Sequence, residues 1–267
     1  MKDILLKEEI LNHSNFELNA NQLFVLDSVC STNLYCRELI KVHPCHETLV
    51  VANMQTAGKG RMGRRFFSPE STGIYMSLIL DCDKISLNEN LLTVAAGVAV
   101  CRVLETLCKI EAAIKWVNDI FSNGKKVCGI LAEGIADSDT NRLKYIILGI
   151  GINISTPDSI FPTELQDIAG SVFPQDTTRN QIIAQIVNEL RNIYMQNQID
   201  KLIKEYKTYS LILGKEINFT QNNKTYIGIA TDINNEGNLI VRLENGEVVT
   251  LKSGEVSIGS ASLINKV

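Results

Sequence analysis

Residues 55–66 read Gln-Thr-Ala-Gly-Lys-Gly-Arg-Met-Gly-Arg-Arg-Phe, a segment in which lysine and arginine are interleaved with glycine. Glycine tolerates positive φ angles, so successive backbone N–H groups can point into one concavity. Lysine and arginine add charge and forked hydrogen-bond donors to such a loop. The segment is therefore suited to wrapping a polyanion, and a solvated surface turn is the alternative interpretation.

The neighbours of this glycine-rich loop argue against two common nucleotide folds. Gly58, Gly60 and Gly63 satisfy the dinucleotide pattern G-x-G-x-x-G, which requires a strand before it and a helix directly after it. Residues 48–55 predict the strand, but residues 73–80 predict a second strand where the helix should follow. A P-loop fails as well, because no lysine followed by serine or threonine closes the segment. The loop is thus expected to connect two strands.

Composition places the chain among globular proteins. With 267 residues, 45% hydrophobic and 21% charged, it can bury a large core and is expected to form one large and one small domain. It carries 30 acidic against 26 basic residues, a formal charge of -4, which argues against non-specific nucleic-acid binding. No apolar stretch approaches the roughly 18 residues that cross a bilayer, and the N-terminus is charged. These features predict a cytoplasmic protein.

The cysteines read as reduced and mostly buried side chains, because there are 7 of them and no C-x-x-C occurs. His43, Cys45 and His46 lie close together in the chain, which raises the question of a metal site. So short a span cannot easily close a tetrahedron, and a loop with incidental ligand types is favoured. Whether these three residues bind anything stays open, and no metal ligand is predicted.

Hydrophobic periodicity and turn signals give the order of the elements. We expect helices over residues 31–40, 90–110, 179–196 and 199–209, a short amphipathic helix over 3–11, and strands over 23–29, 48–55, 73–80, 113–117 and 144–154. The helix over 90–110 has few polar positions and must be largely buried. Short strands follow over 216–220, 224–233, 239–243 and 247–252, separated by turns. We therefore predict an α+β domain over residues 1–210 and a small β-barrel domain over 211–267.

A second group of polar residues surrounds a predicted hairpin. Asn123-Gly124 is the strongest short hairpin signal, so two antiparallel strands should meet there. A lysine is expensive to bury within a strand, and Lys126 should therefore face a polar cleft or solvent. Strict alternation along the strand would place Lys126 and Cys128 on one face and Val127 on the other.

Five segments, taken in order, resemble the motifs of the biotin protein ligases. They are Ser31-Thr-Asn33, the loop from Gln55 to Arg64, Lys115-Trp-Val-Asn-Asp119, Lys126-Val-Cys-Gly-Ile-Leu131 and Gly149-Ile-Gly-Ile-Asn153. The resemblance spans about residues 25–155, and the β-rich tail is similar to the C-terminal SH3-like domain of that family. It implies a class II aminoacyl-tRNA-synthetase-like biotin/lipoate ligase catalytic domain, with a mixed or antiparallel sheet and flanking helices.

The resemblance implies a two-step reaction, that of a biotin-(acetyl-CoA-carboxylase) ligase. Biotin attacks the α-phosphate of MgATP to give biotinyl-5′-AMP and pyrophosphate. A lysine of a biotin carboxyl carrier protein, or of a biotin-dependent carboxylase subunit, then displaces AMP. Because a carboxylate must approach an anionic phosphate, fixed cations have to cancel the repulsion, and Lys126 and Arg61 are the catalytic candidates. Mg²⁺ would be held mainly by phosphate oxygens.

The resemblance also implies which residues contact each substrate. Those implied for biotin are Ser31, Thr32, Asn33, Gln55, Lys59, Gly60, Arg61, Lys126, Gly129, Gly149 and Gly151. Those implied for ATP and the adenylate are Gly58, Arg61, Arg64, Arg65, Phe66, Asn118 and Asn153. Asp119 is the candidate for activating the acceptor lysine. We also expect the glycine-rich loop to be disordered without ligand and to order over the adenylate, which protects it from water.

Three positions depart from the family pattern. Val117 stands where proline is usual, Phe66 stands near a position that is often tryptophan, and Lys59 replaces a common arginine. Phe66 keeps an aromatic surface for adenine but loses an indole donor, and Lys59 keeps the charge without the fork. None of these changes abolishes the implied mechanism.

Three other functions compete with this interpretation. One is a nucleotide-binding sensor without catalysis, which would retain the cations but make no pyrophosphate. A lipoate protein ligase shares the fold and the adenylation chemistry. Its loop is usually richer in consecutive glycines and is followed by a histidine-aspartate pair, and neither feature occurs in this sequence. A biotin-responsive DNA regulator would carry an N-terminal helix-turn-helix, for which about twenty residues before the first strand are too few. We therefore expect a short form without that domain, active as a monomer or homodimer, with no DNA or membrane partner.

Overall fold

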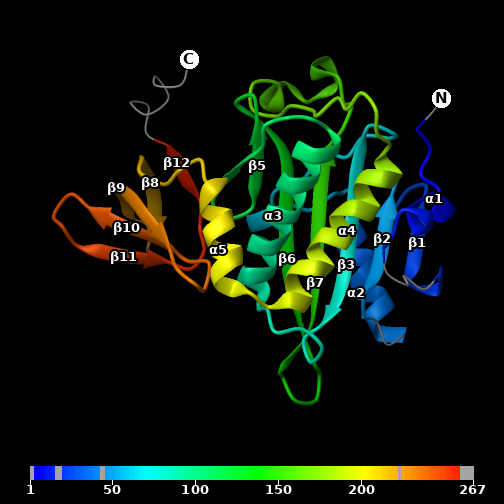
Figure 1. Cartoon of the computed structure of the whole chain (residues 1–267), viewed down its shortest axis with the longest axis horizontal. Helices are drawn as coiled ribbons and strands as arrows, with labels where there is room; N and C mark the ends of the chain where they lie inside the picture. The colour runs from blue at the N-terminus through cyan, green and yellow to red at the C-terminus, as the bar shows by residue number, and fades with distance from the viewer. Residues whose placement is uncertain (1–2, 16–19, 43–45, 222–223, 259–267) are drawn as a thin grey trace.

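The computed structural model describes residues 3–15, 20–42, 46–221 and 224–258. Its centre is a seven-stranded sheet in the order β1-β2-β3-β7-β6-β5-β4 (Figure 1). The strands are β1 (Leu23–Leu26), β2 (Thr48–Ala52), β3 (Gly73–Asp81), β4 (Ala113–Lys115), β5 (Asp119–Ser122), β6 (Lys125–Ala136) and β7 (Leu143–Asn153). β1 pairs with β2 in parallel, and the remaining neighbours are antiparallel. The sheet is therefore mixed, as predicted, and not doubly wound.

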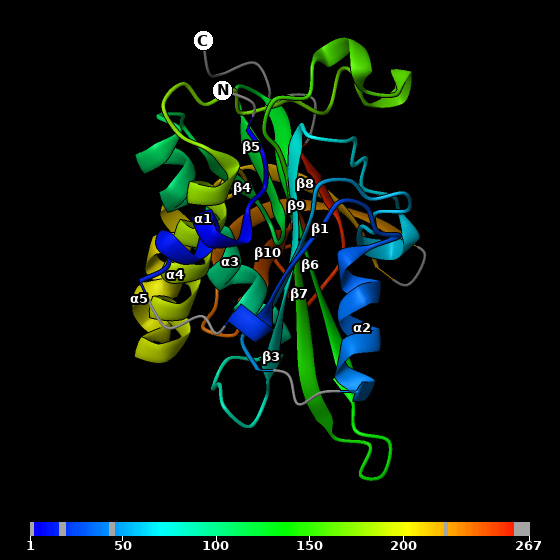
Figure 2. The ribbon, with the colours of Figure 1, turned by 90° about the vertical axis from the view of Figure 1, so that its right-hand side faces the viewer.

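Helices cover both faces of this sheet (Figure 2). α2 (Thr32–Val42) packs on β2, β3 and β7 at one face, while α3 (Glu89–Leu107) and α4 (Arg179–Gln196) pack on the other. α5 (Ile199–Thr208) packs on α3, and α1 (Lys7–Asn12) packs on α4. Four short 3-10 turns complete the domain: η1 (Ala20–Gln22), η2 (Arg61–Gly63), η3 (Asp158–Ile160) and η4 (Thr163–Leu165).

α3 is the core helix that the sequence predicts. Asn88 caps its first turn by accepting a hydrogen bond from the Leu91 backbone N–H at 3.0 Å. The expectation that no apolar stretch approaches membrane-spanning length is wrong for α3, which by length and composition alone could cross a membrane. However, 72% of its apolar window is buried inside the fold. Its side chains pack between the sheet and helices α4 and α5, which is the position of a core helix in a globular domain.

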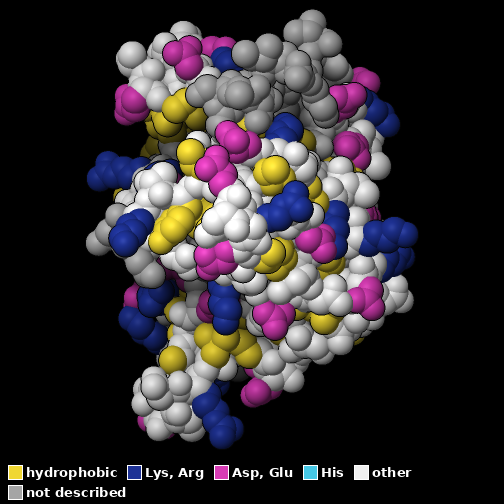
Figure 3. Space-filling view, turned by 90° about the vertical axis from the view of Figure 1, so that its left-hand side faces the viewer, with side chains coloured by type: hydrophobic (Ala, Val, Ile, Leu, Met, Phe, Trp, Pro, Cys, Tyr) yellow, Lys and Arg dark blue, Asp and Glu magenta, His cyan; other side chains and the backbone are white. Residues whose placement is uncertain are grey.

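The β-rich tail forms a second sheet of five antiparallel strands, in the order β11-β10-β9-β8-β12. They are β8 (Glu216–Gln221), β9 (Lys224–Ile233), β10 (Leu239–Leu243), β11 (Val248–Leu251) and β12 (Val256–Ile258). Buried Trp116 donates its indole N–H to the Gly237 carbonyl at 2.9 Å, which joins the second sheet to the end of β4. Seen from the side of the second sheet, acidic and basic side chains are interspersed (Figure 3). The boundary at residues 210 and 211 stays a prediction.

The local predictions succeed where the sequence carries a strong signal. The helix over 179–196 has the predicted bounds, because Thr178 and Gln181 form a capping box at its start. Asn123 and Gly124 adopt φ angles of 49° and 75°, the left-handed pair that a tight hairpin requires between β5 and β6. The strands predicted over 23–29 and 48–55 end earlier, at Leu26 and Ala52. The suggested metal-binding residues His43 and Cys45 lie outside the described residues.

Candidate functional site

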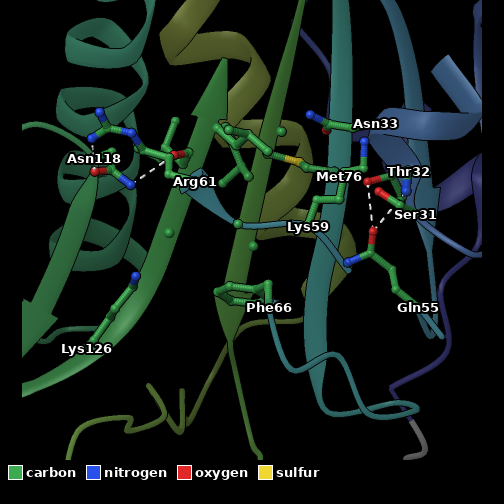
Figure 4. A pocket seen from close by; sticks show the side chains of 17 residues that line it. Ser31, Thr32, Asn33, Gln55, Lys59, Arg61, Phe66, Met76, Asn118 and Lys126 are labelled. Atoms are coloured by element: carbon green, nitrogen blue, oxygen red, sulfur yellow. Dashed lines mark hydrogen bonds between the residues drawn. The ribbon is translucent and has the colours of Figure 1, made fainter. Parts of the chain in front are cut away.

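A pocket opens between the glycine-rich loop, the start of α2 and strands β6 and β7 (Figure 4). Its empty volume is about 460 Å³ when the open solvent at its mouth is included. Its lining consists of Ser31, Thr32, Asn33, Gln55, Lys59, Gly60, Arg61, Phe66, Met76, Asn118, Lys126, Gly129, Ile130, Leu131, Gly149, Ile150 and Gly151. Segments far apart in the chain thus meet at one cavity.

One wall is a network of neutral hydrogen-bonding groups. Gln55 Oε1 accepts from the Thr32 backbone N–H at 2.8 Å, and Gln55 Nε2 donates to Ser68 Oγ at 2.9 Å. Ser77, on β3, donates to Thr32 Oγ1 at 2.7 Å and lies 2.6 Å from Asn33 Oδ1. These side chains are fixed by one another at the start of α2. The wall can therefore present donors and acceptors in set directions to a polar, uncharged ligand group.

The opposite wall carries charge (Figure 4). Arg61, from the glycine-rich loop, donates to Asn118 Oδ1 at 2.7 Å. Asn118 donates in turn to Asp119 Oδ1 at 2.9 Å, and Lys126 Nζ lies 2.7 Å from the same oxygen. Lys126 keeps 30% of its side chain exposed, so its ammonium stays accessible to a ligand. Two cations from separate parts of the chain converge here, and such a wall can hold an anion.

Glycines let other groups approach the floor of the pocket. A Cβ on Gly149 would lie 2.3 Å from Asn33 Oδ1, and one on Gly151 would lie 2.6 Å from the Phe66 ring. Both positions belong to the middle of β7, where the backbone is fixed by ladders to β3 and β6. The absence of side chains there makes room for the polar wall and for the aromatic ring.

A β-bulge corrects the predicted orientation of β6 around Lys126. The ladder pairs Ile120 with Cys128 but Phe121 with Lys126, so Val127 is the extra residue. Val127 and Cys128 are both buried in the core, while Lys126 lines the pocket. The expectation that Lys126 and Cys128 share a face is therefore wrong, because a bulge breaks the period of two.

Burial of Cys128 in the core affects the pKa of its thiol. Complete burial raises the pKa of Cys128 well above its ordinary value, and the positive charge of Lys126 offsets this only in part. A thiol with a raised pKa carries little thiolate at neutral pH and is a poor nucleophile. Cys128 is therefore a core residue of this strand and not a nucleophile of the pocket.

The glycine-rich loop folds back on itself as a compact turn. The Gly60 N–H donates to the Arg64 carbonyl at 2.8 Å, and the Phe66 N–H donates to the Gly58 carbonyl at 2.9 Å. Gly63 has a φ of 75°, in the left-handed region that glycine adopts without cost. The turn points Arg61 inward to the pocket and brings Phe66 back over β7.

Five predicted site residues do not line the pocket. Arg64 pairs with Glu255 of the second sheet at 2.6 Å, and Arg65 is exposed. Asn153 is buried and donates to the Gly170 carbonyl at 3.0 Å. Gly58 packs against the Phe66 carbonyl and Ser68, and Asp119 lies behind Lys126 and Asn118. Their suggested contacts with ATP or the acceptor remain predictions.

Other lining residues were not predicted. Met76, Ile130, Leu131 and Ile150 supply an apolar part of the wall. A strand that lies between two layers is apolar on both faces. The sequences of β3, β6 and β7 therefore mark these positions only as core. Their placement at a cavity follows from the register of the strands, which the sequence does not give.

A segment beyond β7 is attached to the backbone of the pocket lysine. The Lys126 N–H donates to the Ile168 carbonyl at 2.7 Å, and the Gly170 N–H donates to the Lys126 carbonyl at 2.9 Å. The neighbouring Lys125 side chain reaches Asp158 at 2.9 Å on the opposite side of the strand from the pocket. Residues 158–170 therefore fix the strand end that presents Lys126.

Comparison with known proteins identifies the class of this fold and pocket. The model of the biotin/lipoate A/B protein ligase family matches residues 25–153, and that of the biotin protein ligase C-terminal domain matches residues 212–259. The first match contains all 17 pocket residues, and the second contains all five strands of the second sheet. The architecture is that of the ligases that attach biotin or lipoate to proteins.

Curated relatives narrow this class. The bifunctional ligase/repressor BirA of Bacillus subtilis is 35% identical over 249 residues, covering 91% of this chain and 76% of the relative. The biotin-(acetyl-CoA-carboxylase) ligase of Mycobacterium tuberculosis is 30% identical over 218 residues, covering 78% of this chain and 77% of the relative. The chain belongs to the biotin protein ligase family.

Solved structures agree with this assignment. The biotin protein ligase of Aquifex aeolicus in complex with biotin and ATP superposes with a TM-score of 0.74 at 26% identity, covering 89% of this chain and 98% of that one. The enzyme of Leishmania major in complex with biotinyl-5-AMP gives a TM-score of 0.59 at 25% identity, covering 86% and 98%. The mixed sheet, the flanking helices and the second sheet thus form a known arrangement.

Proposed function

We propose that the protein activates biotin with MgATP as biotinyl-5′-AMP and transfers it to a lysine of a biotin carboxyl carrier protein. The observation that carries this proposal is the shared pocket of Lys126 and Arg61, with a neutral polar wall opposite. The names of relatives support it, since the Mycobacterium tuberculosis relative is a biotin-(acetyl-CoA-carboxylase) ligase. The Aquifex aeolicus structure is a complex with biotin and ATP. The Leishmania major structure is a complex with biotinyl-5-AMP.

In the first step, a biotin carboxylate oxygen attacks the α-phosphorus of ATP. The new P–O bond forms as the bond to the β-phosphate oxygen breaks, and pyrophosphate leaves. No base is needed, because the carboxylate is already ionised. The obstacle is repulsion between two anions, and the cations of Lys126 and Arg61 reduce it from fixed positions.

The neutral wall and the charged wall suit different parts of the substrates. The ring end of biotin is polar and uncharged, and the network of Thr32, Gln55 and Ser77 offers it fixed donors and acceptors. The apolar side chains of Met76 and Ile150 suit its aliphatic chain. Phe66 then lies beside the floor of the pocket as an aromatic surface for adenine.

In the second step, the carrier lysine attacks the acyl carbon, AMP leaves, and the amine loses a proton. The lysine must be neutral to attack, although its ordinary pKa is about 10.4. Asp119 is the carboxylate we assign to help remove this proton, because it lies against Lys126 at the charged wall. Release of that contact would free it for the acceptor amine.

Mg²⁺ would be held mainly by the phosphates of ATP, which is how this ion commonly binds nucleotides. Within the described residues no group of three or more histidine, cysteine, aspartate or glutamate side chains gathers as a metal cage. The oxygens of Asn118 and Asp119 at the charged wall are of the hard type that the ion accepts. The ion supplies charge neutralisation to the phosphates when bound.

We further propose that the enzyme acts in the cytoplasm. No disulfide joins the six cysteines among the described residues, a pattern typical of a reducing compartment. The Bacillus subtilis relative is named a ligase and repressor, and the chain covers 76% of it. The pocket supports the ligase activity, and we propose no DNA binding for the residues described.

The experiment that tests this function combines the protein with biotin, MgATP and a biotin carrier domain. Mass spectrometry should show the carrier acylated on one lysine, with AMP and pyrophosphate released in equal amounts. A parallel reaction with lipoate and a lipoyl domain tests the nearest alternative. Acylation by lipoate in place of biotin, or no adenylate with either acid, would overturn the proposal. Duplex DNA binding that depends on salt and on the adenylate would show a regulatory activity in addition.

A further inference from the structure

Glu133, on β6, collects three donors from two other elements at the edge of the pocket. Its Oε2 accepts from Asn33 Nδ2 at 2.7 Å, and its Oε1 lies 3.5 Å from Arg37 Nη2 and 3.9 Å from Lys59 Nζ. Asn33 and Arg37 belong to one face of α2, while Lys59 belongs to the glycine-rich loop. The Glu133 side chain is 22% exposed and does not line the pocket itself. It acts on the pocket through its partners.

The first partner is an amide whose orientation matters. A carboxylate only accepts hydrogen bonds, so Glu133 holds the Nδ2 group of Asn33 toward β6. Asn33 Oδ1 then points to Ser77 Oγ, at 2.6 Å, and packs against the bare backbone of Gly149. The carboxylate thus sets which end of the amide joins the polar wall. Charge assistance makes this bond stronger than a neutral one.

The second partner is a cation of the glycine-rich loop. Lys59 lines the pocket with 38% of its side chain exposed, and Glu133 is the carboxylate within ion-pair distance of its ammonium. The attachment joins the loop to β6, an interior strand of the seven-stranded sheet. A loop held in this way covers the pocket more of the time than one held by its own turn alone.

We propose that Glu133 is a positioning residue that couples closure of the glycine-rich loop to the shape of the biotin wall. It orients Asn33 by one oxygen and retains Lys59 by the other, so a closed loop and an ordered wall occur together. The proposal rests on the assignment of the pocket to biotin. It predicts that loss of the negative charge shortens the time that biotin stays bound, while the chemical step is largely kept.

The test uses Glu133→Gln, which keeps the length of the side chain and removes its charge. Stopped-flow measurements with biotin alone should show dissociation about tenfold faster, the scale of one charge-assisted hydrogen bond. The KM for biotin should rise by a similar factor, with less than about a threefold change in the single-turnover rate of adenylation at saturation. Glu38→Gln is the matched control. Glu38 also belongs to this region, on α2, but it pairs with the exposed Lys41 at the surface.

A double-mutant cycle with Lys59→Met separates positioning from general destabilisation. If Glu133 retains the loop through Lys59, the second substitution adds less to biotin dissociation in the Glu133→Gln background than in the wild type. Unchanged dissociation in Glu133→Gln, or full additivity with Lys59→Met at an unchanged melting temperature, would overturn the inference. Failure of the wild type to bind biotin at all would instead refute the proposed function.

Discussion

Lys126 Nζ lies 2.7 Å from Asp119 Oδ1, and the two residues come from adjacent strands, β6 and β5. Lys126, the cation that we assign to adenylation, is therefore paired with Asp119, the carboxylate that we assign to transfer. Asn118 donates to the same Asp119 oxygen and accepts from Arg61, so one chain of contacts links both cations. An incoming phosphate would compete with Asp119 for Lys126. Contact of Lys126 with the phosphate would release the Asp119 carboxylate.

Replacing Lys126 with alanine should slow adenylation far more than it weakens biotin binding. Loss of one fixed charge at a phosphoryl centre typically lowers the rate by about 100-fold to 1,000-fold. Biotin-dependent exchange of pyrophosphate into ATP measures the step, and calorimetry with biotin measures binding. Lys125→Ala is the matched control, because the Lys125 ammonium reaches Asp158 rather than the pocket. Equal losses in the two variants would refute the assignment of Lys126.

Asp119→Asn should separate the two half-reactions. The amide keeps the shape and one acceptor oxygen but cannot take a proton, so transfer from preformed adenylate to the carrier should slow by about 100-fold. Adenylation should change less, since Lys126 loses a competitor as well as a partner. Quenched-flow transfer with isolated biotinyl-5′-AMP measures the second step alone. Unchanged transfer would show that Asp119 takes no part in it.

The fold could be predicted where residue types fix local geometry. Asn123-Gly124 specified the hairpin, and the capping box of Thr178 and Gln181 fixed the start of α4. The pocket could be predicted from motif residues whose chemistry is unusual for a surface, as in the loop that carries Lys59 and Arg61. Lysine, arginine and glycine in this pattern have few structural reasons to occur together.

The rest depends on register and side-chain direction, which single-sequence patterns do not contain. The bulge at Val127 reverses the alternation around Lys126, and nothing in the residue types announces it. Ser77 and Glu133 look like an ordinary strand serine and a surface glutamate until the sheet places them beside α2. Arg64 and Asn153 belong to the right motifs, yet their side chains are directed to Glu255 and Gly170.

His46 should make stability depend on pH below about 6.5. Burial lowers the pKa of His46 below its ordinary value of 6.5, and the nearby Glu47 carboxylate opposes this in part. Its Nδ1 accepts from the Asp81 backbone N–H at 3.2 Å, which requires an unprotonated nitrogen. Because the unfolded chain binds the proton more tightly, this contribution is complete above about pH 6.5 and is lost as the pH falls through the folded pKa.

Melting temperatures between pH 5 and pH 8 test the effect of His46. The difference between the wild type and His46→Gln should shrink as the pH falls, whereas His13→Gln, at a surface contact with Glu9, should follow the wild type. A difference that stays constant across this range would exclude His46 as the titrating group.

The two glycines of β7 that line the pocket should respond differently to an added methyl group. In Gly149→Ala the new Cβ would lie 2.3 Å from Asn33 Oδ1, so it should disturb the polar wall and weaken biotin binding. In Gly151→Ala it would lie 2.6 Å from the Phe66 ring, which must move away from the floor. Loss of an aromatic contact is worth about 1 kcal/mol, so the KM for ATP should rise about fivefold.

Binding measured separately for each substrate distinguishes these effects. Gly149→Ala should raise the Kd for biotin more than the KM for ATP, and Gly151→Ala should do the reverse, because Asn33 and Phe66 lie over different positions of the same strand. Phe66→Leu in the Gly151→Ala background supplies the control, since a smaller side chain relieves the contact without restoring an aromatic surface. Its KM for ATP should therefore stay high. If both glycine variants weakened biotin binding equally and left ATP unaffected, Phe66 would not be the adenine surface.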